Sequence, residues 1–254
     1  MSGHSKWHNI QAKKTSQDAK RGQLFTKLTK ELIVAARHGG GNPDTNIRLR
    51  TAVERARKMG MPMDNIKKAI MRGTGELPGV SIEEYTYEAY GPGGTAFIIE
   101  ISTDNKNRTV AELRRIFTNI GGSLAESGAV SWNFESKGQI ELEDVGELTY
   151  DDLFMIVADA GGEDLREEGD TFTVITDPKS LEQVREKLEA NGLKIKDAEI
   201  ILVPKNVVKV TGDDALKVVR LSEELENHED VQDYYTNYDI DEDELKVIAD
   251  KIGI

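Results

Sequence analysis

The chain changes its apolar pattern at residues 73–81, and this change limits the folds that are open to it. Before this segment, apolar residues recur every three or four positions, as they do on one face of a helix. After it, short alternating or continuous apolar runs typical of strands are mixed with further helical patterns. The segment itself, "GTGELPGVS", contains three glycines and one proline and therefore indicates a linker. We predict an α+β protein whose helical part comes first.

The residues before the linker predict three amphipathic helices. The first spans about residues 16–38, the second begins near Asn42 and Pro43 and closes at Gly60, and the third opens at Pro62. Proline suits the first turn of a helix, because its missing N–H has no partner there. Three such helices with short connections form a small bundle.

The residues after the linker predict alternating strands and helices. The run "TAFIIEIST" indicates a buried strand, and a helix capped near Asp104 or Asn107 follows it. The segment "GAVSWNFESKGQIELE" indicates a hairpin that turns at Lys137 and Gly138. Such intermixed elements favour mixed or antiparallel sheets, and their number fits two ferredoxin-like halves.

Charge is distributed unevenly between these two parts. Residues 1–72 hold nine lysines, seven arginines and five acidic residues, which gives a net charge of +11. The rest of the chain holds 17 basic and 41 acidic residues, a net charge of −24. Such asymmetry indicates that the first part contacts a polyanion and that the second part is repelled by it.

The basic residues of the helical part are the candidate site. On a helical wheel Lys20, Lys27, Lys30 and Arg37 lie beside or opposite the apolar stripe, so we expect them to stay solvated together. Basic residues of the second helix fan across its solvent side in the same way. The predicted nucleic-acid-binding residues are Lys6, Trp7, Lys13, Lys14, Lys20, Arg21, Lys27, Lys30, Arg37, Arg48, Arg55 and Lys58. Trp7 either stacks on a base or packs on the body of the protein.

Patterns for enzymatic chemistry are weak in this sequence. Gly91, Gly93 and Ala96 match a dinucleotide fingerprint by spacing, but they lie between two predicted strands instead of opening a helix. The acidic run 239–244 lacks the glycine that a calcium loop needs at its sixth position. The chain has no cysteine and no run of about 18 apolar residues. We therefore expect no enzyme, no catalytic residue, no cofactor, no metal and no membrane partner.

Three long segments resemble the YebC/PmpR family. They are "GHSKWHNIQAKKTSQDAKRGQLFTKLTKEL", "AYGPGGTAFIIEISTDNKNRTVAELRRIF" and "SGAVSWNFESKG". The resemblance implies a basic helical domain at residues 1–79, an α/β domain formed by 80–131 and 207–254, and a third α/β domain, 132–206, inserted into the second. It also implies a nucleic-acid role for the matching residues Lys6, Trp7, Lys13, Lys14, Lys20, Arg21 and Lys27.

Two functions remain open at this point. The resemblance implies a cytoplasmic, DNA-binding transcriptional regulator, which we expect to be a monomer. The alternative is a translation factor that binds ribosomal RNA or the ribosome and acts at stalled or proline-rich stretches. Charge alone does not separate them, because phosphate contacts carry no sequence information.

Overall fold

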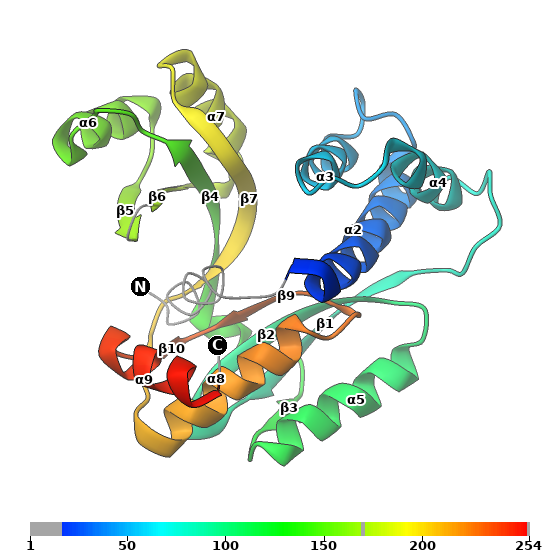
Figure 1. Ribbon diagram of the computed structural model, residues 1–254, viewed down its shortest axis with the longest axis vertical. Coiled ribbons are helices and arrows are strands. Elements are labelled where there is room, and N and C mark those ends of the chain that lie inside the picture. Colours follow the sequence, from blue (N-terminus) through cyan, green and yellow to red (C-terminus); the bar gives the residue numbers. More distant parts are fainter. Residues whose placement is uncertain (1–16, 169–170, 253–254) are drawn as a thin grey trace. The chain divides into compact units, whose positions relative to one another are not determined.

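The computed structural model describes residues 17–168 and 171–252, and it divides the chain into two compact units (Figure 1). Unit 1 contains the described residues up to Trp132 and those from Val207 onward. Unit 2 is the intervening segment Asn133–Asn206. The prediction that the residues of unit 1 form two separate domains, divided at residue 79, stays a prediction.

Unit 1 begins with three packed helices: α2 (Gln17–Gly39), α3 (Ile47–Lys58) and α4 (Met63–Gly73). Their shared core contains Leu32, Leu49 and Ile66, which are almost completely buried. Gly73 permits α4 to lie close to α2, since a Cβ there would stand 2.4 Å from the carbonyl oxygen of Ile33. The predicted helical pattern before the linker is confirmed in these described residues.

The second helix starts later than its sequence pattern suggests. Asn42 and Pro43 belong to a turn, and α3 is capped instead by Asn46, whose side chain accepts a hydrogen bond from the Leu49 N–H at 3.0 Å. The same Asn46 amide donates to the carbonyl oxygens of Ala35 and Gly40, both at 2.8 Å. Asn46 therefore binds free backbone groups at two helix ends: it caps the start of α3 and pairs with carbonyl oxygens at the end of α2. The prediction that the third helix opens at Pro62 is confirmed, since Pro62 caps α4.

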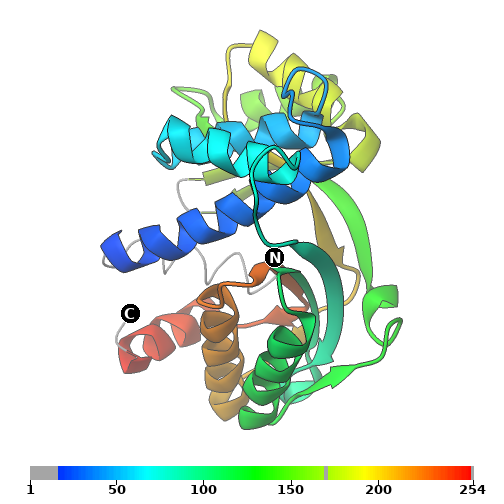
Figure 2. The same ribbon diagram turned by 90° about the vertical axis from the view of Figure 1, so that its right-hand side faces the viewer.

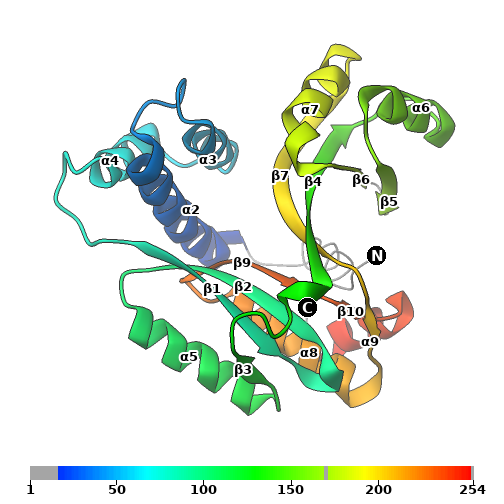
Figure 3. The same cartoon turned by 180° about the vertical axis from the view of Figure 1, so that it is seen from behind.

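The rest of unit 1 is built on an antiparallel sheet with the strand order β3-β1-β2-β9. Helices α5 and α8 cover one face of this sheet, and α2 lies along the other face (Figures 1 and 2). Figure 3 shows β3 at the edge, beside β1. The elements of this part are β1 (Glu83–Tyr90), β2 (Ala96–Thr103), α5 (Lys106–Asn119), β3 (Ser123–Ala125), α8 (Gly212–Glu226) and β9 (Val231–Thr236).

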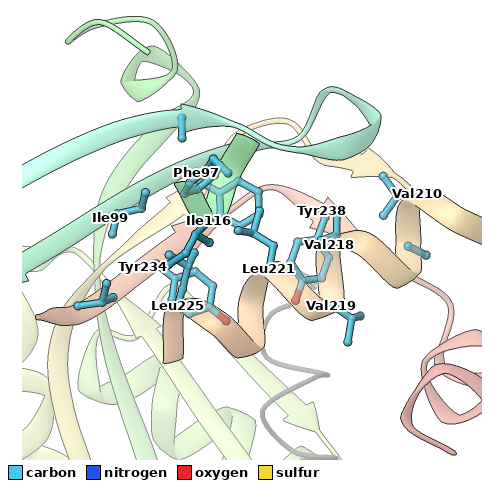
Figure 4. Packing of buried hydrophobic residues seen from close by; sticks show 14 of the residues in the cluster. Phe97, Ile99, Ile116, Val210, Val218, Val219, Leu221, Leu225, Tyr234 and Tyr238 are labelled. Atoms are coloured by element: carbon cyan, nitrogen blue, oxygen red, sulfur yellow. The ribbon is translucent and has the colours of Figure 1, made fainter. Parts of the chain in front are cut away.

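The core of this sheet lies between its strands and helices α5 and α8. Phe97 of β2 packs edge-on against Phe117 of α5 with ring centroids 5.6 Å apart, and stacks on Tyr234 of β9 at 6.4 Å. Figure 4 shows Leu221 and Leu225 of α8 reaching toward these strands. Two short parallel strands, β8 (Val208–Lys209) and β10 (Tyr238–Asp239), and helix α9 (Glu242–Ile252) complete unit 1.

Unit 2 follows the order strand, helix, two strands, helix, strand. Its antiparallel sheet has the order β5-β6-β4-β7. Side chains of both helices enter one core with Ile140 and Val174 of the sheet. The elements are β4 (Phe134–Asp144), α6 (Tyr150–Ala160), β5 (Asp164–Glu168), β6 (Thr171–Thr176), α7 (Leu181–Ala190) and β7 (Lys194–Pro204). Three short 3₁₀ turns complete the described elements: η1 (Pro92–Gly94), η2 (Ser131–Asn133) and η3 (Pro178–Ser180).

The hairpin predicted at Lys137 and Gly138 is wrong. Both residues lie within the single long strand β4, where Gly138 pairs with Thr176 of β6 and Ile200 of β7. The glycine is needed for packing and not for a turn, since a Cβ there would stand 2.3 Å from Thr176 Oγ1. The first turn of α5 also differs slightly, because Asn105 is its cap.

The fold class predicted from the sequence, α+β with antiparallel sheets after a helical part, is confirmed for the described residues. In the ranges 17–168 and 171–252, no helix combines the length and apolar character needed to cross a membrane.

Candidate nucleic-acid interface

The two shorter helices of unit 1 carry a marked excess of positive charge. Residues 47–73, which comprise α3, α4 and their connection, contain eight basic residues and two acidic ones. The apolar sides of both helices are buried in the core shared with α2, so that the basic side chains are directed outward. Six of them are exposed: Arg48, Arg57, Lys58, Lys67, Lys68 and Arg72.

Two predicted cations of α2 face the sheet of unit 1 instead of solvent. Lys27 donates a hydrogen bond to the Glu226 carbonyl oxygen at 2.8 Å. Lys30 donates to the Glu229 carbonyl oxygen at 2.9 Å and to Asp230 Oδ1 at 2.5 Å. Burial lowers the pKa of the Lys27 ammonium, although the nearby Asp233 and Glu226 carboxylates oppose that shift. Both lysines therefore join α2 to the segment between α8 and β9.

Asp230 is the centre of this junction, and its side chain is only 3% exposed. Besides Lys30, its carboxylate accepts hydrogen bonds from Arg108 Nη2 at 2.9 Å, Thr109 Oγ1 at 2.6 Å and Thr103 Oγ1 at 3.2 Å. Burial by itself raises the pKa of a carboxyl group. Here the donors from Lys30, Thr109 and Arg108 prevail and hold the pKa of Asp230 well below its usual range. Asp230 is therefore ionised and joins α2, β2, α5 and β9.

A group of possible metal ligands lies next to this junction. Glu112, His228 and Asp230 offer ligand atoms that all lie within 4.8 Å of one another. The imidazole Nδ1 of His228 accepts a hydrogen bond from the Asp230 N–H at 3.1 Å, and its Nε2 lies 3.2 Å from a carboxylate oxygen of Glu112. Lys30 and Arg108 already supply positive charge to Asp230. The donor set is therefore satisfied by the chain itself and fits a structural hydrogen-bond network better than a metal ion.

Two further predicted cations are exposed but have partners in the first strand and its approach. Arg37 Nη1 donates to the Ile82 carbonyl oxygen at 2.6 Å and to Ser81 Oγ at 3.1 Å. Arg48 forms a two-point contact with the Glu84 carboxylate, with Nη1 lying 3.0 Å from Oε2. The hydrogen bond with Glu84 raises the pKa of Arg48, which therefore stays charged.

The expectation that Lys20, Lys27, Lys30 and Arg37 stay solvated together is therefore wrong for Lys27 and Lys30. A helical wheel places them away from the apolar stripe, but the sheet of unit 1 covers that side of α2 (Figure 2). In the structure, Lys27 and Lys30 hold α2 against the sheet through their hydrogen bonds with the segment between α8 and β9. The part that Lys27, Lys30, Arg37 and Arg48 play in nucleic-acid binding stays a prediction.

The remaining predicted residues fall into two groups. Lys6, Trp7, Lys13 and Lys14 lie outside the described residues, and so does the side chain of Lys20. Arg21 is exposed and lies over the ring of Phe25, with its guanidinium carbon 5.5 Å from the ring centroid. Arg55 is half-buried and Lys58 is exposed on α3. As nucleic-acid contacts, all of these residues stay predictions.

The structure adds three exposed cations that the sequence-based set omitted: Lys67, Lys68 and Arg72 of α4. Lys68 and Arg72 are four positions apart and therefore share one side of the helix. Within the described ranges, these three side chains form no ion pair with any acidic residue. The signal was present in "IKKAIMRG", where two lysines and an arginine flank the apolar positions.

Comparison with known proteins identifies the family. The family described as "TACO1/YebC protein N-terminal domain" matches residues 5–76, and "TACO1/YebC second and third domain" matches residues 82–238. A protein of Dictyoglomus turgidum named "Probable transcriptional regulatory protein" is 56% identical over 249 residues, covering 98% of this chain and all of its own. A protein of the same name from Thermotoga maritima is 52% identical over 252 residues, covering 99% of both chains.

A solved structure has the same fold. The crystal structure of a conserved hypothetical protein from Aquifex aeolicus is 44% identical, with a TM-score of 0.81 over 88% of this chain and 92% of that one. The two family matches together span most of the sequence, from residue 5 to residue 238. The resemblance noted in the sequence is thereby confirmed, and the chain belongs to the TACO1/YebC family.

Proposed function

We propose that this protein is a nucleic-acid-binding regulator of gene expression that acts on DNA as a transcriptional regulator. The observation that carries the proposal is the outward-facing cation set of α3 and α4, above all Lys67, Lys68 and Arg72, which have no acidic partner among the described residues. The name printed for the Dictyoglomus and Thermotoga relatives supports the choice of transcription.

The proposed contact is made to phosphates. Lysine and arginine side chains neutralise backbone charge and release condensed counterions, which provides affinity without reading sequence. No helix-turn-helix pattern was identified in the sequence, so we assign register and sequence preference to no side chain. The predicted basic residues before α2 would extend the contact along the same polyanion.

We propose that the protein is not an enzyme and that it works in the cytoplasm. We propose also that each sheet with its two helices is a ferredoxin-like domain, the second one inserted into the first. In this arrangement β1 occupies the position of the third strand of the motif, although it comes first in the chain.

A charge-matched pair of triple variants tests the contact. Lys67→Ala, Lys68→Ala and Arg72→Ala together remove three charges from α4. Lys209→Ala, Lys246→Ala and Lys251→Ala remove three charges from exposed positions of β8 and α9 in the same unit. Binding of full-length protein to a 30-base-pair duplex is measured by fluorescence anisotropy at several salt concentrations. The slope of log K against log salt is negative, and each lost phosphate contact makes it less negative by about 0.9, so the slope of the α4 variant is expected to be less negative by up to about 2.7.

The control variant is expected to keep the wild-type slope. Equal slopes for the wild type and the α4 variant would show that α4 does not contact the phosphates. Crosslinking in cells, followed by sequencing of the bound DNA and RNA, then identifies the target. Peaks at promoters support the transcriptional proposal, whereas enrichment of ribosomal RNA without promoter peaks would replace it with the ribosome-bound alternative.

A further inference from the structure

Unit 2 exposes four large apolar side chains in the first half of α6 and just before it. Leu148 is 37% exposed, Tyr150 43%, Phe154 46% and Met155 61%. A different side of the same helix is buried in the core of unit 2 through Leu153, Val157 and Ala160. An amphipathic surface helix needs only one apolar side to fold. The exposed apolar side chains of α6 therefore do not contribute to the core of unit 2. We refer to Leu148, Tyr150, Phe154 and Met155 as the α6 patch.

The α6 patch is held in place. Tyr150 donates a hydrogen bond from its hydroxyl to the Leu165 carbonyl oxygen at 3.1 Å. Its ring stacks on that of Phe154, with centroids 6.4 Å apart and an interplanar angle of 20°. Thr149 and Asp152 form a capping box that fixes the first turn of the helix. Aromatic groups that are already ordered lose little conformational entropy on binding, while the flexible thioether of Met155 adapts to a partner.

The stretch of chain that carries the patch is acidic. The segment from residue 143 to residue 164 contains eight acidic residues and no lysine, arginine or histidine. Glu163 and Asp164 pair with Lys137 and Arg166, at the far end of this segment. The exposed carboxylate of Asp152 belongs to the capping box. The exposed carboxylates of Glu147, Asp151 and Asp159 lie within four positions of a patch residue, and within the described residues none of these three pairs with a basic side chain.

The carboxylates beside the patch favour one chemical class of partner over others. A polyanion such as DNA or RNA, or an anionic membrane surface, is repelled by a cluster of carboxylates. A protein segment with apolar side chains on one side and lysine or arginine on the other complements both the patch and its acidic border. A second copy of unit 2 would bring the same acidic border against itself, which opposes self-association.

We propose that the α6 patch is a docking surface for a basic, amphipathic segment of another protein. Apolar side chains of that segment pack on Phe154 and Met155, and its basic side chains meet Glu147, Asp151 and Asp159. This surface is independent of the nucleic-acid contact proposed for unit 1, and it gives the acidic part of the chain a function of its own.

A designed peptide probes the surface in the full-length protein. The probe is a fluorescent 15-residue peptide of leucine and lysine, with leucine at helical spacing of three and four residues. Phe154→Ser combined with Met155→Ser is expected to weaken its binding at least tenfold. Val247→Ser is the matched control, since Val247 is 53% exposed on the acidic helix α9 and is the one large apolar side chain exposed among the described residues of that helix. The control is expected to bind the peptide as the wild type does.

Three outcomes would overturn the proposal. The first is equal affinity of the patch variant and the wild type for the probe peptide. The second is equal binding of a peptide in which serine replaces leucine, because the interaction would then depend on charge alone. The third is a concentration-dependent dimer in analytical ultracentrifugation that the patch variant abolishes, because a second copy would then cover the patch.

The partner is then identified by its chemistry. A photoreactive phenylalanine analogue is placed at position 155 or, as control, at position 247, and crosslinked peptides from cells are sequenced by mass spectrometry. Peptides specific to position 155 are expected to be basic and amphipathic, and a synthetic copy is expected to displace the probe peptide from the wild type. Acidic peptides, or copies that do not displace the probe, would contradict the proposal. Because nucleic-acid binding resides in unit 1, either result leaves the salt-slope experiment on α4 unaffected.

Discussion

Lys30 Nζ lies 2.5 Å from Asp230 Oδ1, and this ion pair joins residues 200 positions apart in the chain. It connects the first described helix of unit 1 to the residue that immediately precedes β9. Arg108 reaches the other carboxylate oxygen from the start of α5 at 2.9 Å. One buried carboxylate therefore holds together elements that are formed by the beginning, the middle and the end of the sequence.

Removing this carboxylate is expected to destabilise unit 1. Asp230→Asn leaves Lys30, whose side chain is 13% exposed, without its ionic partner, and the loss of one partner of a buried pair costs about 3 kcal/mol. The measurement is the free energy of unfolding in urea. Asp243→Asn removes a fully exposed carboxylate that pairs with Lys246, and it is expected to change this free energy by less than about 0.5 kcal/mol. Equal stability of both variants and the wild type would show that the junction is not stabilising.

Acid is expected to destabilise the protein through two buried carboxylates, Asp230 and Glu88. Burial opposes ionisation of Glu88, but hydrogen bonds from the N–H groups of Gly128, Val130 and Ser131 lower its pKa from the ordinary value of 4.5. The pKa of Asp230 is lowered from 3.8. A carboxyl group whose pKa is lower in the folded state stabilises the fold above its unfolded pKa, and that contribution is lost as the pH falls.

The corresponding measurement is the unfolding free energy between pH 7 and pH 2. The contribution of these two groups is expected to be constant from pH 7 to about pH 5.5 and to decline below about pH 4.5, as both groups begin to be protonated in the unfolded chain. Asp230→Asn is expected to make this decline shallower, and Asp243→Asn to leave it unchanged. An unchanged acid decline in Asp230→Asn would contradict the assignment of an ionised Asp230.

Local patterns predict much of the fold but not the side of α2 that meets the sheet. The helical periodicity before residue 73 and the alternating runs after it correctly predict helices, strands and the α+β class. Lys27 and Lys30 are different, because a helical wheel contains no information about a sheet contributed by residues near 230. Gly138 was misread for a related reason, since a lysine–glycine pair is typical of a turn and the packing of Thr176 on that glycine is visible only in three dimensions.

The candidate nucleic-acid interface, too, is predicted only in part by the sequence. Net charge correctly indicates where the positive residues gather, because composition is a property of the sequence alone. Which of them have acidic partners depends on tertiary contacts, as the two-point contact of Arg48 with Glu84 illustrates. The exposed cations Lys67, Lys68 and Arg72 of α4 emerge only when the buried sides of all three helices are known.

Inward-facing and outward-facing lysines are expected to differ in their effect on nucleic-acid binding. Lys68→Met is expected to make the negative slope of log K against log salt on duplex DNA shallower by about 0.9 and to leave stability nearly unchanged. Lys30→Met is expected to leave that slope unchanged and to lower the free energy of unfolding, because its ammonium group is paired with Asp230. Anisotropy titrations and urea unfolding on the same two proteins separate these effects. A shallower slope for Lys30→Met would show that the residue reaches phosphate, as the helical wheel first suggested.

The packing of β4 against β6 makes a further prediction for unit 2. Gly138→Ala places a methyl group where Thr176 Oγ1 stands 2.3 Å away and Leu181 Cδ1 3.1 Å away, and overpacking of this kind costs about 1–3 kcal/mol. Thermal unfolding of the full-length variant is expected to show this loss in unit 2. Adding Thr176→Ala removes the nearest atom and is expected to recover part of the loss, although it also deletes the hydrogen bond from Thr176 to the Asp177 carbonyl oxygen. If Gly138→Ala were as stable as the wild type, β4 would not require glycine at this position, and the close approach of Thr176 would not be what keeps a larger residue out.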